Sequence, residues 1–183
     1  MGSVWRDARS IADLGHAMAL WMEGRGPDWP GYHGPFGQEE ENGARHLIPT
    51  LAAANRAGFV TTGSQPASDG YWGGARWRQR AHVDGVVHDR SPLLGRLTAL
   101  ERQGFQVYRG WPKEGVVITD RDGEPQTGFG GFRLGRDHAA REWHGIGRHA
   151  LRELKDHGVR LNIVDMTWGR DDRLWPALAN AIR

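Results

Sequence analysis

The stretch G-F-V-T-T-G-S-Q-P-A-S-D-G, Gly58 to Gly70, contains the end of a predicted helix and the start of a predicted sheet. Gly58 is a typical helix stop, and the apolar, β-branched run 59–62 predicts a short buried strand. A glycine-rich loop is expected over 63–75. Hydroxyl and amide side chains at the mouth of a buried strand either tie off a turn through their own backbone or face a polar ligand.

Helical and strand patterns alternate along the rest of the chain. The predicted helices are 10–23 (with a capping box of Ser10 and Asp13), 44–57, 91–104, 137–157 and a terminal helix capped by Asp171 or Asp172. The predicted strands are 59–62, 75–87, 105–108, 116–119, 126–132 and 160–164. The sequence therefore predicts a single α+β domain over 1–183, with a mixed β-sheet flanked by helices.

Composition narrows the class of protein. The formal net charge is only +2 and the positive and negative residues alternate, so no basic tract is available to follow a phosphate backbone and nucleic acid is not an expected partner. The absence of cysteine excludes disulfides, iron–sulfur clusters and thiol nucleophiles. No apolar run approaches about 18 residues and no signal-peptide core is visible, so we expect a soluble cytoplasmic protein without a membrane partner.

The sequence contains none of the catalytic or metal-binding motifs that we compared with it. The nine histidines form no H-x-x-x-H or H-E-x-x-H pattern, so no metal site is predicted. Ser64 lacks the G-x-S-x-G context of a nucleophilic serine. The glycines of T-G-F-G-G-F, residues 127–132, fit neither a P-loop nor a dinucleotide fingerprint, and they indicate close approach of the backbone to a ligand or a neighbouring strand.

Several stretches resemble, in order, the C-terminal regulatory domain of eukaryotic methylenetetrahydrofolate reductase. T-T-G-S-Q-P at 61–66, after a helix ending A-N-R-A-G, resembles the family's T-I-N-S-Q-P after V-N-R-Q-G. Y-W-G-G-A-R-W-R-Q-R-A-H at 71–82 resembles its W-G-x-x-G-G-Y and Q-K-A-Y stretches, and V-R-L-N-I-V-D-M-T-W-G-R-D-D-R-L-W at 159–175 resembles L-V-N-L-V-D-N-D-F-P-L-D-N-C-L-W. The helix S-I-A-D-L-G-H-A-M-A-L-W-M-E-G and the stretch T-G-F-G-G-F-R-L-G-R are weaker matches.

The resemblance implies a stand-alone regulatory-type domain that binds S-adenosylmethionine and, in competition, S-adenosylhomocysteine. A chain of 183 residues cannot also hold the reductase's (β/α)₈ barrel with its flavin site. The residues that the resemblance places at the ligand are Thr61 and Ser64, their motif neighbours Thr62 and Gln65, and the later threonines Thr119 and Thr127.

One position departs from the family. A Glu-Thr pair that contacts ligand there corresponds to Gly43 and Ala44 here, and Glu41 is the candidate replacement for the carboxylate. A ribose diol suits such a carboxylate. The sulfonium of S-adenosylmethionine is a cation that can lie against an aromatic face, for which the candidates are Tyr32, Trp5 and Trp168. The aromatic, glycine- and proline-rich loop expected over 24–43 could close over the ligand.

Three functions remain open at this point. The first is a small-molecule-binding domain that acts as a sensor or partner subunit. The second is an enzyme that uses S-adenosylmethionine as a lyase, hydrolase or alkyl or methyl transferase, with His33, Glu41 or Asp165 in acid–base roles. The third is a protein-interaction domain with a decayed pocket, whose tryptophans in predicted loops would cover a protein partner. These tryptophans are Trp29, Trp72, Trp111 and Trp168.

Overall fold

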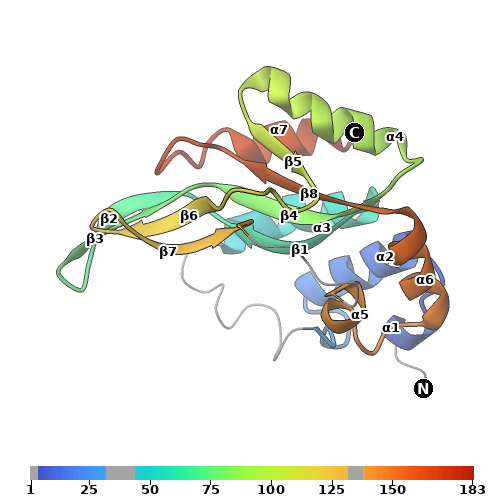
Figure 1. Ribbon diagram of the computed structural model, residues 1–183. Helices are drawn as coiled ribbons and strands as arrows, with labels where there is room; N and C mark the ends of the chain where they lie inside the picture. Colours follow the sequence, from blue (N-terminus) through green and yellow to red (C-terminus); the bar gives the residue numbers. More distant parts are fainter. Residues whose placement is uncertain (1–3, 32–43, 132–137) are drawn as a thin grey trace.

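The computed structural model describes residues 4–31, 44–131 and 138–183, which form two four-stranded sheets with helices around the first (Figure 1). The helices are α1 (Val4–Asp7), α2 (Ile11–Met22), α3 (Ile48–Arg56), α4 (Pro92–Thr98), α5 (His138–Glu142), α6 (Arg148–His157) and α7 (Leu174–Ala181), with short 3-10 helices at Arg45–Leu47 and Ala99–Gln103. The strands are β1 (Phe59–Gln65), β2 (Ser68–Trp72), β3 (Ala75–Gln79), β4 (His82–His88), β5 (Gln106–Arg109), β6 (Val116–Arg121), β7 (Glu124–Phe129) and β8 (Gly158–Val164).

The strand orders are β1-β4-β8-β5 in the first sheet and β2-β3-β6-β7 in the second. The predicted α+β single domain is confirmed. The expected mixed sheet is wrong in its pairing, because every strand pair among the described residues is antiparallel. In the second sheet β2 and β3 are joined by a tight turn, as are β6 and β7, and such a turn reverses the chain and leaves only the antiparallel pairing.

The loop expected over 63–75 is also wrong, since β1 continues to Gln65 and β2 and β3 form a hairpin. Gly73 and Gly74, both with positive φ (59° and 79°), form the two-residue turn that this hairpin geometry favours. The strand expected over 75–87 bends at Arg80 and Ala81, so that β3 lies in the second sheet and β4 in the first. The backbone of the bend is satisfied by Ile118 and Asp165.

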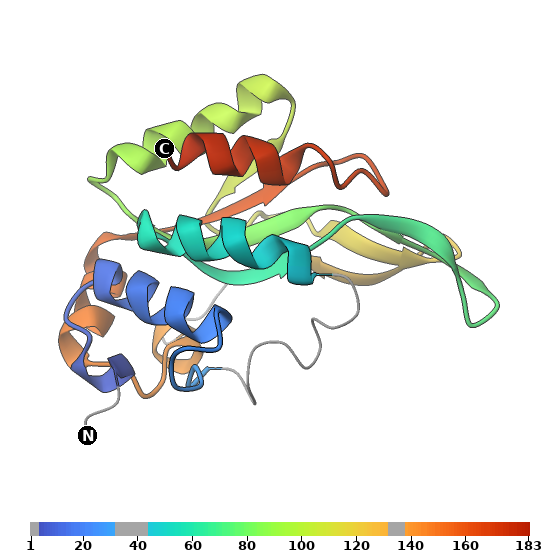
Figure 2. The same cartoon turned by 180° about the vertical axis from the view of Figure 1, so that it is seen from behind.

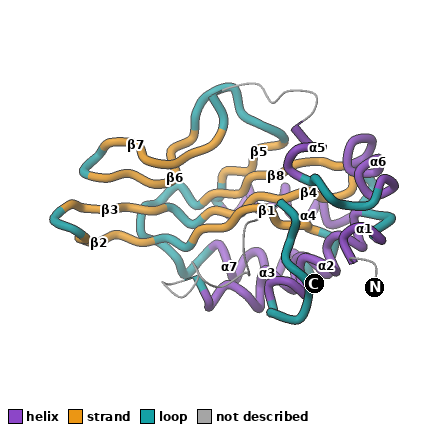
Figure 3. Tube along the Cα trace, turned by 90° about the horizontal axis from the view of Figure 1, so that it is seen from below, coloured by secondary structure: helices purple, strands orange, loops and turns teal. Residues whose placement is uncertain are grey.

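Four helices lie side by side against one face of the first sheet: α2, α3, α7 and α4 (Figure 2). They and the sheet enclose the main core, whose largest members include Phe59, Leu51, Leu97, Leu161 and Ile163. Helices α5 and α6 lie on the opposite side of the strands from α3 and α7 (Figure 3). A smaller core of Val116, Ile118, Phe129 and Val164 lies between the two sheets.

The helix boundaries follow from local chemistry. The capping box of Ser10 and Asp13 is confirmed at the start of α2. The long helix expected over 137–157 is wrong, because Gly145 has a positive φ of 81° and interrupts it between α5 and α6. The predicted aspartate cap of α7 is wrong as well, since Asp171 instead accepts hydrogen bonds from the Trp175 indole and the Ala67 backbone (2.8 and 2.7 Å).

Candidate ligand-binding site

A cavity of about 350 Å³ opens where the first sheet, the β6–β7 hairpin and α5 meet. This volume falls in the range of small-molecule sites, roughly 300–1,000 Å³. The cavity is lined by Gly63, Ser64, Gln65, His82, Asp84, Trp111, Ile118, Thr127, Gly128, Phe129, His138, Glu142, Arg160 and Asn162. Its wall therefore draws on segments spread over most of the chain.

Strand β1 reaches the cavity because its register shifts between Thr61 and Gly63. Such a bulge inserts one extra residue and re-aims the side chains that follow. Glycine at position 63 leaves room for the Asp84 carboxylate, which would have to shift if a Cβ were added there. After the bulge, Ser64 and Gln65 line the cavity.

A cluster of charged groups forms one side of the cavity. The Arg160 guanidinium donates to Asp84 Oδ2 (2.8 Å) and to Glu142 Oε2, and the Thr62 hydroxyl donates to the same Asp84 oxygen (2.6 Å). Their side chains are only 12% (Arg160), 14% (Asp84) and 19% (Glu142) exposed. Two carboxylates and one guanidinium give the cluster an excess of negative charge.

Aromatic rings form the neighbouring wall. The His82 imidazole stacks on Phe129, with ring centroids 5.0 Å apart. Trp111 packs edge-on against Phe129 at 5.9 Å and lies 6.0 Å from the Arg160 guanidinium. An aromatic wall beside excess negative charge is a setting that favours a cationic ligand with a flat ring.

Two polar atoms of the wall, His82 Nε2 and Asn162 Oδ1, are shielded from solvent and make no well-formed hydrogen bond to a described residue, although the two side chains are neighbours. Desolvation lowers the pKa of His82, against the opposing influence of Asp84 and Asn162, so the imidazole is neutral near pH 7. Buried polar atoms without partners are costly in a native structure and call for an explanation. A bound ligand that offers a donor and an acceptor supplies one.

A second polar network ties the two sheets together. Gln65 Nε2 and the Thr127 hydroxyl both donate to the Thr119 hydroxyl, each at 2.8 Å. Thr119 is buried behind the wall, whereas Gln65 and Thr127 line it. The network places the amide of β1 and the hydroxyl of β7 side by side.

The structure thus brings together several residues singled out by the sequence. Ser64, Gln65 and Thr127 line the cavity, and Thr62 and Thr119 bond to residues that line it. These positions span more than 60 residues of sequence, since Thr62 and Thr127 are 127 − 62 = 65 apart.

Other expected site residues lie elsewhere. Thr61 faces α3, where its hydroxyl accepts from Asn55 Nδ2 (2.8 Å) and its backbone N–H donates to Asn55 Oδ1 (2.9 Å). Trp5 is buried in the main core and donates to the Pro27 carbonyl. Trp168 lies under the guanidinium groups of Arg78 and Arg80, in a separate hollow. None of these three faces the cavity.

Asp165 does not suit the acid–base role expected of it. It is fully buried and accepts two hydrogen bonds from Arg170, at 2.7 and 2.8 Å. Burial raises the pKa of Asp165, but the bonds from Arg170 and the Thr167 backbone outweigh it and hold the pKa below the ordinary value. Tyr32, His33, Glu41 and Gly43 lie outside the described residues.

Sequence reasoning missed the groups that dominate the wall: His82, Asp84, Glu142, Arg160 and Asn162. A signal was present in two of the strands. The run H-V-D at 82–84 and the run R-L-N at 160–162 each place polar side chains on every second residue of a strand whose alternate residues are apolar. That pattern marks one face of a half-buried sheet as polar, although nothing in it shows that the face encloses a cavity.

Fold and site together define an α+β domain with a charged, aromatic cavity at the junction of two antiparallel sheets. The family model described as "Domain of unknown function (DUF6919)" matches residues 1–183, and the chain belongs to this family. Comparison with curated proteins gave no match. Within the ranges that the structure describes, no helix combines the length and apolar character needed to cross a membrane.

Proposed function

We propose that the chain is a small-molecule-binding domain whose ligand occupies the junction cavity, and that the ligand is S-adenosylmethionine or S-adenosylhomocysteine. One observation carries the proposal: the cavity combines excess negative charge, aromatic faces, hydroxyls and amides in a single open wall. This set matches the chemistry of an adenosyl amino acid, which offers a flat base, a diol, an ammonium group and, in S-adenosylmethionine, a sulfonium.

The charged cluster supplies the anionic part of this match. The diol of a ribose binds well to a carboxylate, and Asp84 and Glu142 provide two. They take the role for which Glu41 was the sequence candidate. The Trp111 face, next to this cluster, suits a cation.

The uncharged polar side chains of the cavity supply the other hydrogen bonds that the proposed ligand needs. Ser64 and Thr127 offer hydroxyls that can donate or accept, and Gln65 and Asn162 offer amides. The shielded atoms His82 Nε2 and Asn162 Oδ1 then gain partners in the complex. The resemblance of 61–66 to the T-I-N-S-Q-P motif is independent support, because it points to the same end of β1.

Titration calorimetry with each ligand tests the proposal. We expect binding at one site per chain, weakened roughly 10- to 150-fold in Asp84→Asn, since loss of one charge-assisted hydrogen bond costs roughly 1.5–3 kcal/mol. Thr61→Val is the matched control, because Thr61 lies on the same strand but faces α3. Absence of binding to either compound, or equal weakening in both variants, would contradict the proposal.

Chromatography of the ligand after long incubation separates binding from catalysis. A binding domain returns S-adenosylmethionine unchanged, whereas the enzyme alternative yields a cleaved or dealkylated product. His138 and Glu142, whose side chains lie 3.9 Å apart in the cavity wall, are the pair to vary if product is found.

The protein-interaction alternative has its own supporting observation. Of the tryptophans expected in loops, Trp29 is buried and only Trp72 is largely exposed (76%), next to Tyr71 (81%) at the β2–β3 hairpin. Their exposure is costly without a covering partner. Sedimentation of the wild-type chain against Tyr71→Ser/Trp72→Ser would reveal self-association through this hairpin; a monomer in both cases counts against a second copy as the partner.

A further inference from the structure

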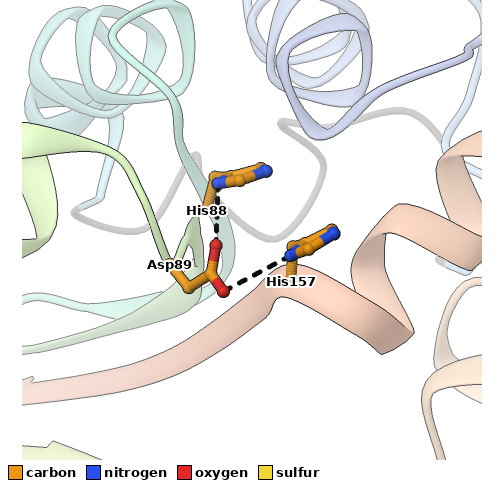
Figure 4. Close-up of side chains that lie close together, drawn as sticks. All are labelled: His88, Asp89 and His157. Atoms are coloured by element: carbon orange, nitrogen blue, oxygen red, sulfur yellow. Dashed lines mark hydrogen bonds and ion pairs between the residues drawn. The ribbon is translucent and has the colours of Figure 1, made fainter.

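A second group of side chains lies away from the cavity, where the end of β4 meets the end of α6 (Figure 4). It consists of His88, Asp89 and His157. The β4–β8 pairing sets His88 opposite Gly158, and the Asp89 backbone donates to the His157 carbonyl (2.8 Å). The sheet ladder therefore holds together residues that are far apart in sequence.

The three side chains lie close together. Asp89 Oδ1 lies 3.1 Å from Nδ1 of His88, and Asp89 Oδ2 lies 3.3 Å from Nδ1 of His157. The two imidazole rings are nearly parallel, at 13°, with centroids 5.0 Å apart (Figure 4). One ligand atom from each residue lies within 4.8 Å of the others. Ligands of a tetrahedral zinc ion, at about 2.0–2.1 Å from the metal, are roughly 3.3 Å from one another.

Two further contacts surround the His88 ring. The Arg90 backbone N–H donates to Nδ1 of His88 (3.1 Å), so this nitrogen carries a lone pair, and Asp89 Oδ1 lies 3.1 Å from the same nitrogen. On the other side, Nε2 lies 3.6 Å from Glu153 Oε1. Glu153 is itself held by the Ile11 backbone N–H at the start of α2 (2.6 Å). A carboxylate hydrogen-bonded behind a histidine is the usual outer support of a metal-ligating imidazole, and a shift of a few tenths of an ångström would bring Glu153 into that role.

We propose that His88, Asp89 and His157 bind one divalent metal ion of the zinc class, with water completing the coordination. Two imidazoles and a carboxylate suit Zn²⁺ and its transition-metal neighbours, whereas Mg²⁺ and Ca²⁺ prefer oxygen ligands alone. The ion displaces the Arg90 N–H from His88 and clips the end of β4 to the end of α6. The side chains are 28% (His88), 41% (Asp89) and 36% (His157) exposed, which gives the ion access.

The metal site is separate from the junction cavity. His88 is four residues beyond Asp84 on the same strand, a distance of about 13 Å at 3.3 Å per residue. The two proposals therefore succeed or fail independently.

Zinc titration of chelator-treated protein, followed by competition with a coloured chelator, tests the site. We expect one Zn²⁺ per chain and a rise in melting temperature. Affinity should fall at least about 100-fold in His157→Ala and about 10- to 100-fold in Glu153→Gln, the range seen for outer-support residues. His144→Ala is the matched control, because His144 is exposed, pairs with the Arg141 carbonyl, and lies outside the cluster.

Two results would overturn the proposal: no binding at one equivalent of Zn²⁺, or equal binding by the wild type and His157→Ala. Cobalt absorption of the wild-type protein is a second measurement that needs no variant. Intense visible bands of a four-coordinate ion are expected, and a spectrum of fully hydrated, six-coordinate Co²⁺ would refute the site even if His157→Ala failed to fold.

Discussion

On the face of the first sheet that α3 and α7 cover, the strands present Phe59, Leu161 and Ile163, all fully buried. On the opposite face the same strands present Asp84, Arg160 and Asn162, and a cavity lies in front of them. The helix-covered face is stabilised by non-directional apolar burial, while the cavity face depends on directed charge pairs. The difference shows that one face carries the apolar core, whereas the other carries the polar groups to which the proposed ligand would bind.

The largest effect should come from the helix-covered face. Phe59→Ala removes a ring that packs over Gly85 in the main core, and we expect a loss of about 4 kcal/mol in the free energy of unfolding. Urea denaturation measures it. Tyr71→Ala, at a position 81% exposed, should change stability by no more than about 0.5 kcal/mol. Equal losses of unfolding free energy in both variants would show that the helix-covered face contributes no more to stability than the exposed surface does.

The next effect tests the charged cluster. Arg160→Met leaves the Asp84 and Glu142 carboxylates near one another without their shared cation, and we expect a loss of about 3 kcal/mol, because breaking one partner of a buried pair is costly. The control is Arg76→Met. Arg76 makes a similar two-point contact with Asp69, but the pair is 49% and 33% exposed, and such pairs are worth about 0.5 kcal/mol. An unchanged free energy of unfolding in Arg160→Met would show that the cluster does not stabilise the fold.

Two neighbours on β1 sharpen the comparison. Thr61→Val should cost about 1 kcal/mol of stability and leave ligand affinity unchanged, because Asn55 keeps its bond to the Leu51 carbonyl. Ser64→Ala should do the reverse, changing stability little and weakening ligand binding about fivefold, the equivalent of one ordinary hydrogen bond. Denaturation and calorimetry on both variants check the prediction. A loss of ligand affinity in Thr61→Val together with a loss of stability in Ser64→Ala would mean that the bulge does not separate a structural residue from a ligand-binding residue.

The smallest effect is a pH dependence from His82. Desolvation holds the folded-state pKa of His82 below its ordinary 6.5, so the unfolded chain binds a proton more readily and stability falls as pH drops below about 6.5. The aspartates with lowered pKa values titrate below 3.8 and do not contribute between pH 7 and 5. His82→Gln should flatten the slope of unfolding free energy over this window. His144→Gln, at an exposed histidine, should leave the slope intact.

Local chemistry made several elements predictable. The start of α2 followed from Ser10 and Asp13, which bond reciprocally. The β6–β7 hairpin followed from its D-R-D-G turn, in which Asp122 and Gly123 take positive φ values of 53° and 91°. The end of α3 followed from Gly58. Each of these signals acts within a few residues and needs no tertiary partner.

What escaped prediction depends on distant contacts. The break between α5 and α6 is reinforced at Gly147, where a Cβ would collide with the Ala8 carbonyl of another segment. The Arg160–Asp84 pair spans 76 residues, and the His88–His157 stack spans 157 − 88 = 69. A single sequence displays the alternation of each strand but not which strand lies beside it.

Strand β8 lies between β4 and β5 in the first sheet, although it is the last of the strands to emerge along the chain. During synthesis its two neighbours must therefore wait for residues 158–164 before the sheet can close, and Arg160 and Asn162 arrive only then. Assembly is dominated by long-range pairings, which slow folding. A nascent chain that stops before β8 lacks Arg160 and Asn162, so the wall of the cavity is complete only when the last strand of the sheet is in place.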